Sequence, residues 1–282
     1  MSETTQDILV HTEAGVCTIT FNRADKKNSI TEAMYASMAD ALAQAGEDAA
    51  VRCVVFQGDM AIFSAGNDIA DFLKQSAGGS ARPEGEQRPV WRFLHNIAAF
   101  PKPVIAAVCG PAVGIGTTLL LHCDLVYAGD NAAFSLPFVN LGLCPEAASS
   151  LLLPQMLGYH RAAEALLLGE PFLAEAALEV GLVNRVVPPS ECNALAQAQA
   201  RKLAATSQRS TSGDSPSRSG RLRTSSTRTA GGWAAPARWR RRRCACRPER
   251  ALCSDSSDGV ALPSSTGTPS ALPRTRAKSR AW

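Results

Sequence analysis

The stretch VIAAVCGPAVGIG, residues 104–116, joins a short apolar run to a turn that contains three glycines. The first five residues have the length and composition of a buried strand, and a helix is predicted from Ile115 to His122. The stretch CVVFQGDMAIFSAGNDI, residues 53–69, repeats the pattern of a buried strand that leads into a glycine turn. Two such units predict an α/β domain in which strands alternate with helices.

The other predicted elements continue this alternation through the first two hundred residues. Two strand-like runs, 8–11 and 16–21, flank a turn at 12–15 and predict a β-hairpin. A helix is predicted from its N-cap Thr31 to Gly46, because apolar side chains recur there at helical spacing. The remaining elements are a strand at 125–128 and helices near 146–157, 161–168 and 174–180, with Gly181 capping the last.

A change in composition divides the chain into two parts. Residues 1–203 carry 13 Lys and Arg against 21 Asp and Glu, whereas residues 204–282 carry 16 against 4. The second part holds only five Leu, Ile, Val and Phe residues, too few to bury the surface that would offset its chain entropy. We therefore predict a domain at 1–205 and a basic, Ser-, Arg- and Pro-rich disordered tail at 206–282. A glycine- and proline-containing stretch at 76–89 predicts a mobile loop, a candidate lid.

The composition argues against membrane and secreted proteins. No run of 18 apolar residues is present, and residues 1–7 are polar and acidic, so neither a membrane span nor an export signal is expected. Cys17, Cys53, Cys109 and Cys123 lie within apolar runs, as is typical of small buried thiols in a reducing compartment. We expect a cytoplasmic protein.

Two glycine turns carry the strongest chemical signal: FSAGNDI at 63–69 and GPAVGIG at 110–116. Such turns can aim backbone N–H groups at an anion, and the second also begins a helix whose dipole favours negative charge. Two N–H groups that converge on one oxygen form an oxyanion hole, in which one donor stabilises an enolate by roughly 3 to 4 kcal/mol. Taken singly, either turn is explained as well by glycines that only permit a tight turn.

Four motifs in order give the chain a family resemblance. The two glycine turns follow FNR at 21–23 with KN at 27–28, and precede LPF at 136–138 with LG at 141–142. Together they resemble the crotonase superfamily of enoyl-CoA hydratases and isomerases. The resemblance implies a crotonase (ClpP-like) fold of repeated ββα units that assembles as a homotrimer or hexamer. It also implies an acyl-CoA thioester substrate whose carbonyl oxygen accepts hydrogen bonds from the N–H groups of Asn67 and Ile115.

The acid–base residues of the family distinguish its reactions. Hydratases have one carboxylate on the helix after the second glycine turn and another directly after the later proline, and here those positions are Thr118 and Phe138. Neither side chain activates water, so hydratase activity is disfavoured. The chain looks like the Δ3,Δ2-enoyl-CoA isomerase branch, whose catalytic glutamate falls on Glu146. A double-bond shift needs only one base, which moves a proton from C2 to C4 of a dienolate.

A structural role for Glu146 is the alternative. Pro145 fits the first position of a helix, and a glutamate beside it is favoured by the helix dipole. Burial would raise the pKa of Glu146 and a helix N-terminus would lower it, so the sequence leaves that pKa open.

Further substrate contacts are implied by the resemblance alone. Arg23, Lys26 and Lys27 would lie near the coenzyme A phosphates and pantetheine, with a surface basic cluster as the alternative. The other implied contacts are Ala65, Gly66, Asp68, Ile69, Gly114, Phe138 and Leu141, among which Asp68 also suits a structural role. No cofactor is expected, because coenzyme A is part of the substrate and the backbone holds the enolate charge.

No metal site is predicted. Residues 122–124, His-Cys-Asp, suit core packing and capping, and Cys244 with Cys246 lack the matching pair that a zinc site needs.

The tail departs from the family, whose members continue past residue 205 with helices that complete the substrate pocket and the trimer interface. The abrupt change motivates the hypothesis that the tail is a frameshifted reading of a GC-rich gene. If the tail is genuine, Arg240–Arg243 near Trp233 and Trp239 support a rival function, nucleic-acid binding on a crotonase scaffold, which we rank well below an enzyme. A catalytically inactive acyl-CoA binder is a further alternative.

Overall fold

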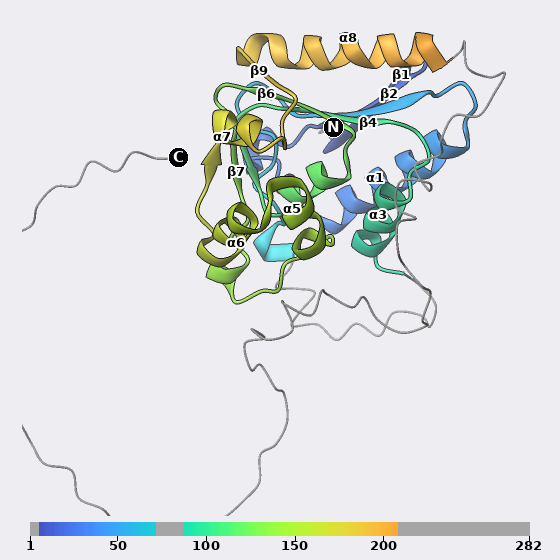
Figure 1. The fold of residues 1–282 in the computed structure, drawn as a ribbon. Helices are drawn as coiled ribbons and strands as arrows, with labels where there is room; N and C mark the ends of the chain where they lie inside the picture. The colour runs from blue at the N-terminus through green and yellow to red at the C-terminus, as the bar shows by residue number, and fades with distance from the viewer. Residues whose placement is uncertain (1–5, 72–86, 208–282) are drawn as a thin grey trace, which may run out of the picture. The chain divides into compact units, whose positions relative to one another are not determined.

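A computed structural model describes residues 6–71 and 87–207 of the chain (Figure 1). The predicted disorder of the tail, the candidate lid up to residue 86 and the basic cluster of Arg240–Arg243 lie outside the described residues. Within the described ranges, no helix combines the length and apolar character needed to cross a membrane.

The chain begins with the predicted β-hairpin. Strand β1 (Ile8–Glu13) pairs antiparallel with β2 (Val16–Phe21). The turn is shorter than expected, because β1 continues to Glu13 and leaves only Ala14 and Gly15, whose φ angles are 48° and 79°. Two consecutive positive φ angles suit the turn whose twist matches that of the flanking strands.

A six-stranded sheet forms the centre of the domain, in the order β1-β2-β3-β4-β6-β9. Beyond the hairpin every neighbouring pair is parallel. The added strands are β3 (Cys53–Gln57), β4 (Val104–Val108), β6 (Leu125–Gly129) and β9 (Arg185–Val187). The β4 residues are all buried, as expected for a parallel strand covered on both faces.

A second sheet contains three strands, in the order β5-β7-β8. It contains β5 (Pro111–Val113), β7 (Ala133–Ser135) and β8 (Phe172–Leu173). The chain leaves β4 through Gly110 (φ 65°), where an added Cβ would lie 1.8 Å from Ala61 O, so only glycine fits this crossing. Strand β4 thus leads to β5 and then to helix α4 (Ile115–Thr118), which is one of the predicted ββα units.

Helices cover both faces of the large sheet. Helix α1 (Glu32–Glu47), whose N-cap Thr31 accepts a hydrogen bond from Met34 N, packs beside α3 (Pro89–Ala98) on one face (Figure 1). Helix α8 (Pro189–Ser207) lies along the opposite face (Figure 1). The sequence analysis missed α8, although Cys192, Ala196, Ala200 and Ala204 recur every four residues and all are buried against the sheet.

Two helix predictions need correction. The predicted helix 115–122 is α4 followed by a 3-10 turn, η2 (Leu119–His122). The helix predicted from Glu146 is α5 (Ser149–Leu157), which begins three residues later because Ala147 and Ala148 adopt φ angles of 50° and 55°. The last two predicted helices are present as α6 (Tyr159–Leu168) and α7 (Ala174–Glu179), and Gly181 follows α7 with φ 79°.

Candidate functional site

The two glycine turns lie side by side. Ser64 and Ala112 form a parallel bridge, in which Ser64 N donates to Pro111 O at 3.1 Å and Val113 N donates to Ser64 O at 2.9 Å. An added Cβ on Gly66 (φ 89°) would lie 2.9 Å from Val113 O, so this close approach of two backbones requires glycine. Tertiary pairing therefore brings together two segments that are remote in the sequence.

The backbone N–H of Asn67 is turned away from its bridging partner. Ile30 N donates to Gly66 O at 2.8 Å and Asp68 N donates to Ile30 O at 3.0 Å, so the bridge uses groups on either side of Asn67. Because successive backbone N–H groups of an extended segment point in opposite directions, the Asn67 N–H faces away from Ile30.

Ile115 occupies the equivalent place on the second turn. It is the first residue of α4 and is 1% exposed, and its predecessor Gly114 has φ 55° and donates to Ser135 O at 2.9 Å. The N–H groups in the first turn of a helix have no intrahelical partner. Asn67 and Ile115 each follow the Ser64–Ala112 bridge by three residues, so both turns present an N–H at corresponding positions.

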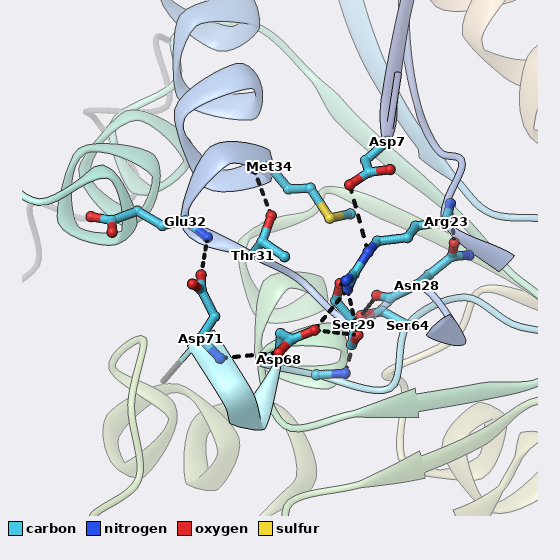
Figure 2. Close-up of polar contacts among 11 residues, drawn as sticks. Asp7, Arg23, Asn28, Ser29, Thr31, Glu32, Met34, Ser64, Asp68 and Asp71 are labelled. Carbon is cyan, nitrogen blue, oxygen red and sulfur yellow. Dashed lines mark hydrogen bonds and ion pairs between the residues drawn. The ribbon is translucent and has the colours of Figure 1, made fainter. Parts of the chain in front are cut away.

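A polar cluster around Arg23, which follows β2, reaches the turn that carries Asn67 through Asp68 (Figure 2). The Arg23 guanidinium donates to Ser29 O at 2.9 Å, to Ser29 Oγ at 2.8 Å and to Asp68 Oδ2 at 2.8 Å. The Arg23 Nε also lies 3.6 Å from Asp7 Oδ2. Hydrogen bonding from Arg23 is the main cause that lowers the pKa of Asp68. Arg23 is thus held by protein acceptors, and its contact with coenzyme A stays a prediction.

The same cluster reaches the start of α1. Asp71 N donates to Asp68 Oδ1 at 3.1 Å, and Glu32 N donates to Asp71 Oδ2 at 2.7 Å (Figure 2). A carboxylate that accepts from a first-turn N–H supplies one of the partners that a helix N-terminus lacks. The Asn67 turn and the N-terminus of α1 are therefore joined by two aspartates.

Tyr35 contacts the Asn67 turn from α1 and was missed by the sequence analysis. Its hydroxyl donates to Asn67 Oδ1 at 2.5 Å, and the side chain is buried. The sequence held a signal, because Tyr35 follows Met34 on the buried face of a predicted helix, where a tyrosine hydroxyl usually needs a polar partner. That partner was not predictable from the sequence.

Glu146 lies in an irregular segment between η3 (Val139–Leu141) and α5, outside any helix. The helix-start explanation of this residue was therefore wrong. Its Oε1 is buried and has no hydrogen-bond partner among the described residues. Burial raises the pKa of Glu146 to about 7. The negative charge of Glu146 also contributes, after burial, to raising the pKa of Tyr35, which indicates that the two side chains share one region.

The two positions that carry carboxylates in hydratases are buried. Thr118 is 0% exposed, and its Oγ1 has no hydrogen-bond partner in the part of the chain that the structure describes. Phe138 is 6% exposed. Neither position therefore supplies a second carboxylate beside that of Glu146, whose buried Oε1 has no hydrogen-bond partner among the described residues.

The other predicted site residues divide between the turns and the surface. Ala65 N donates to Lys27 O at 2.9 Å, which ties the basic loop to the first turn. Lys26, Ile69 and Leu141 are exposed, the last two at 69% and 62%. No three His, Cys, Asp or Glu side chains gather as metal ligands within residues 6–71 and 87–207.

Comparisons with known proteins agree with this architecture. The sequence profile of the family described as enoyl-CoA hydratase/isomerase matches residues 11–212. Enoyl-CoA delta isomerase 2 of Rattus norvegicus is 43% identical over 189 residues, which cover 67% of this chain and 48% of that protein. The chain spans about half the length of the enoyl-CoA delta isomerases that it matches.

Two bacterial proteins are also similar. The 1,2-epoxyphenylacetyl-CoA isomerase of Escherichia coli K12 is 39% identical over 201 residues, which cover 70% of this chain and 76% of that protein. The solved structure of Pseudomonas aeruginosa OdaA is 50% identical and superposes with a TM-score of 0.66, covering 71% of this chain and 78% of that one. The predicted crotonase fold is confirmed by these likenesses.

Proposed function

This chain belongs to the enoyl-CoA hydratase/isomerase family, and we propose on that premise that it moves the double bond of a 3-enoyl-CoA to the 2-trans position. The observation that carries the proposal is the carboxylate of Glu146, which has a buried oxygen without a hydrogen-bond partner among the described residues. Such an oxygen is free to accept a proton from a bound substrate.

The two glycine turns supply the electrostatic part of the mechanism. The thioester carbonyl oxygen accepts hydrogen bonds from the N–H groups of Asn67 and Ile115, which form an oxyanion hole. These donors act most strongly when the oxygen becomes an enolate, because they are fixed before the charge develops. The adjacent bridge between Ser64 and Ala112 supports this assignment, since it holds the two turns in register.

Glu146 supplies the proton transfer. Its carboxylate removes a proton from C2 of the 3-enoyl-CoA, and the electrons spread over the thioester oxygen and C4 as a dienolate. The protonated Glu146 then returns the proton to C4, so that the double bond lies between C2 and C3 and the base is regenerated. A pKa raised to about 7 suits both steps, because a base is most effective when its pKa is near the working pH.

The side chains at two further positions favour isomerisation over hydration. Adding water to a double bond requires a group that activates water together with a proton donor. Thr118 and Phe138 stand where hydratases have their carboxylates, and both are buried. A phenyl ring at 138 also excludes water from the dienolate, which would otherwise be protonated at the wrong carbon.

The proposal has consequences for cofactors and assembly. The substrate is neither oxidised nor reduced and the enolate charge is held by N–H groups, so the reaction needs no metal or redox cofactor. Coenzyme A enters as part of the substrate. A homotrimer or hexamer and a cytoplasmic location stay predictions, and nucleic-acid binding stays the lower-ranked alternative.

The test is conversion of a 3-enoyl-CoA into the conjugated 2-enoyl-CoA, followed by the absorbance of the new conjugated thioester. Glu146→Gln keeps the size of the side chain and removes the base, so we expect kcat to fall by roughly 10² to 10⁴. Glu164→Gln is the control, because it neutralises an exposed glutamate on α6 and should leave kcat unchanged.

Two results would contradict the proposal. One is full isomerase activity of the Glu146→Gln variant. The other is a wild-type protein that adds water to a 2-enoyl-CoA faster than it isomerises a 3-enoyl-CoA, which would place the chain among the hydratases.

A further inference from the structure

The hydroxyl of Tyr35 is a buried polar group that the proposed mechanism does not use. Tyr35 is 4% exposed, and its ring packs on Phe93 with centroids 5.6 Å apart. The side chain reaches from α1 to the first glycine turn, where its hydroxyl donates to Asn67 Oδ1 at 2.5 Å. A hydrogen bond in a buried setting is stronger than the same bond at the surface, because little water competes for either group.

This bond fixes the side chain of Asn67. The backbone on either side of Asn67 is already held by Ile30, through Gly66 O and Asp68 N. The Tyr35 hydroxyl adds a third point of attachment, at the end of the side chain. With its backbone and carboxamide both held, Asn67 has little freedom to rotate, and the direction of its N–H is set before a ligand arrives.

Tyr35 remains a hydrogen-bond donor throughout the working pH range. Burial is the main cause that raises its pKa well above the ordinary value, and the charge of Glu146 adds to the effect. The phenol therefore stays protonated while Glu146 alternates between its two protonation states.

We propose that Tyr35 is a positioning residue, which acts through Asn67 by holding the oxyanion N–H where the enolate oxygen forms. The inference rests on the proposed function, in which the Asn67 N–H stabilises an enolate. It adds a role for a helix residue that lies outside both glycine turns. The role concerns the enolate more than the bound thioester, because a donor that is fixed in advance contributes most when charge develops.

The experiment compares two ligands in wild type and Tyr35→Phe. Butanoyl-CoA presents an ordinary thioester, whereas acetoacetyl-CoA readily forms an enolate. We expect Tyr35→Phe to weaken acetoacetyl-CoA binding about fivefold to tenfold, the value of one hydrogen bond, and to change butanoyl-CoA binding less than about twofold. Tyr127→Phe is the control, because it removes the hydroxyl of another buried tyrosine, in the core cluster beside α8.

A second variant keeps the test decisive if Tyr35→Phe does not fold. Asn67→Ala removes the acceptor of the same bond and retains the backbone N–H. It should therefore weaken acetoacetyl-CoA binding and leave butanoyl-CoA binding nearly unchanged, as Tyr35→Phe does. Where both variants fold, the double variant should lose no more affinity for acetoacetyl-CoA than either single variant, because both substitutions remove the same hydrogen bond.

The outcomes separate the inference from the proposed function. The positioning role is overturned if Tyr35→Phe weakens the binding of both ligands equally, or if its preference for acetoacetyl-CoA over butanoyl-CoA equals that of wild type. Wild type that binds both thioesters but does not isomerise a 3-enoyl-CoA overturns the proposed function alone. Wild type that binds neither thioester overturns both.

Discussion

Arg23 and Asp68, which are 45 residues apart in the sequence, share a 2.8 Å ion pair that ties the segment after β2 to the turn that carries Asn67. Their side chains are 18% and 16% exposed. An ion pair that is mostly shielded from water is screened less than a surface pair, and its loss leaves one charge without its partner. The pair therefore links the stability of the domain to the geometry of the candidate site.

Removing the cation of this pair should destabilise the protein. We expect Arg23→Gln to lower the free energy of unfolding by about 2 kcal/mol, because the guanidinium Nη1 shares its two hydrogens among three acceptors, one of which is the Asp68 carboxylate. Denaturant unfolding measures the difference. Arg92→Gln is the matched control, since its ion pair with Asp40 is exposed and its loss should cost less than about 1 kcal/mol. Equal effects of the two variants would show that burial does not strengthen the Arg23 pair.

The Asp68 carboxylate predicts a loss of stability in acid. Its folded-state pKa is lowered, chiefly by the hydrogen bond from Arg23, so its contribution is present above the unfolded pKa of about 3.9 and is lost as the pH falls through the folded value. Asp68→Asn should be less stable than wild type near pH 7, and the difference should shrink as the pH falls below about 4. Unfolding free energies measured from neutral pH downward test this. A constant difference would mean that the carboxylate charge contributes nothing.

The Glu146 carboxylate sets the expected pH dependence of catalysis. Because the ionised form is the base and its pKa is about 7, kcat/KM for a 3-enoyl-CoA should rise through about pH 7 and level off above it. At about pH 5 it should be roughly a hundredfold below that plateau. Circular dichroism at each pH provides the control for unfolding. A profile whose midpoint lies near the ordinary pKa of glutamate would contradict the burial of this side chain.

Replacing either of two neighbouring threonines on α4 with valine should change the free energy of unfolding, and the two changes should have opposite signs. Thr118→Val removes a buried hydroxyl that has no partner among the described residues, so we expect unfolding of the ligand-free protein to require about 1 kcal/mol more. Thr117→Val removes a hydroxyl that donates to Ala112 O at 2.5 Å and accepts from Ser135 N at 3.3 Å, and should destabilise by about 2 kcal/mol. Thermal and denaturant unfolding distinguish the two. A destabilised Thr118→Val protein would indicate a hydrogen bond to that hydroxyl.

Local pattern was sufficient for most of the elements that position the site. The apolar runs of β3 and β4 and the cap at Thr31 depend on neighbouring residues alone, and their predicted positions agree with the structure. The start of α5 was not predictable in this way, because two alanines at positive φ precede it and nothing in their side chains marks that conformation. Helix α8 was missed although its spacing was visible, since small residues give a weak amphipathic signal.

The sequence by itself determined the alternation of strands and helices, the two glycine turns and, through their order, the family. Only the tertiary structure decided which groups meet: the bridge that aligns the turns, the bond between Tyr35 and Asn67, and the commitment of Arg23 to Asp68. It also decided that Glu146 lies outside a helix with a pKa of about 7. The physical reason is that turns and strands follow from local conformational preference, whereas pairing, burial and desolvation depend on segments that are distant along the chain.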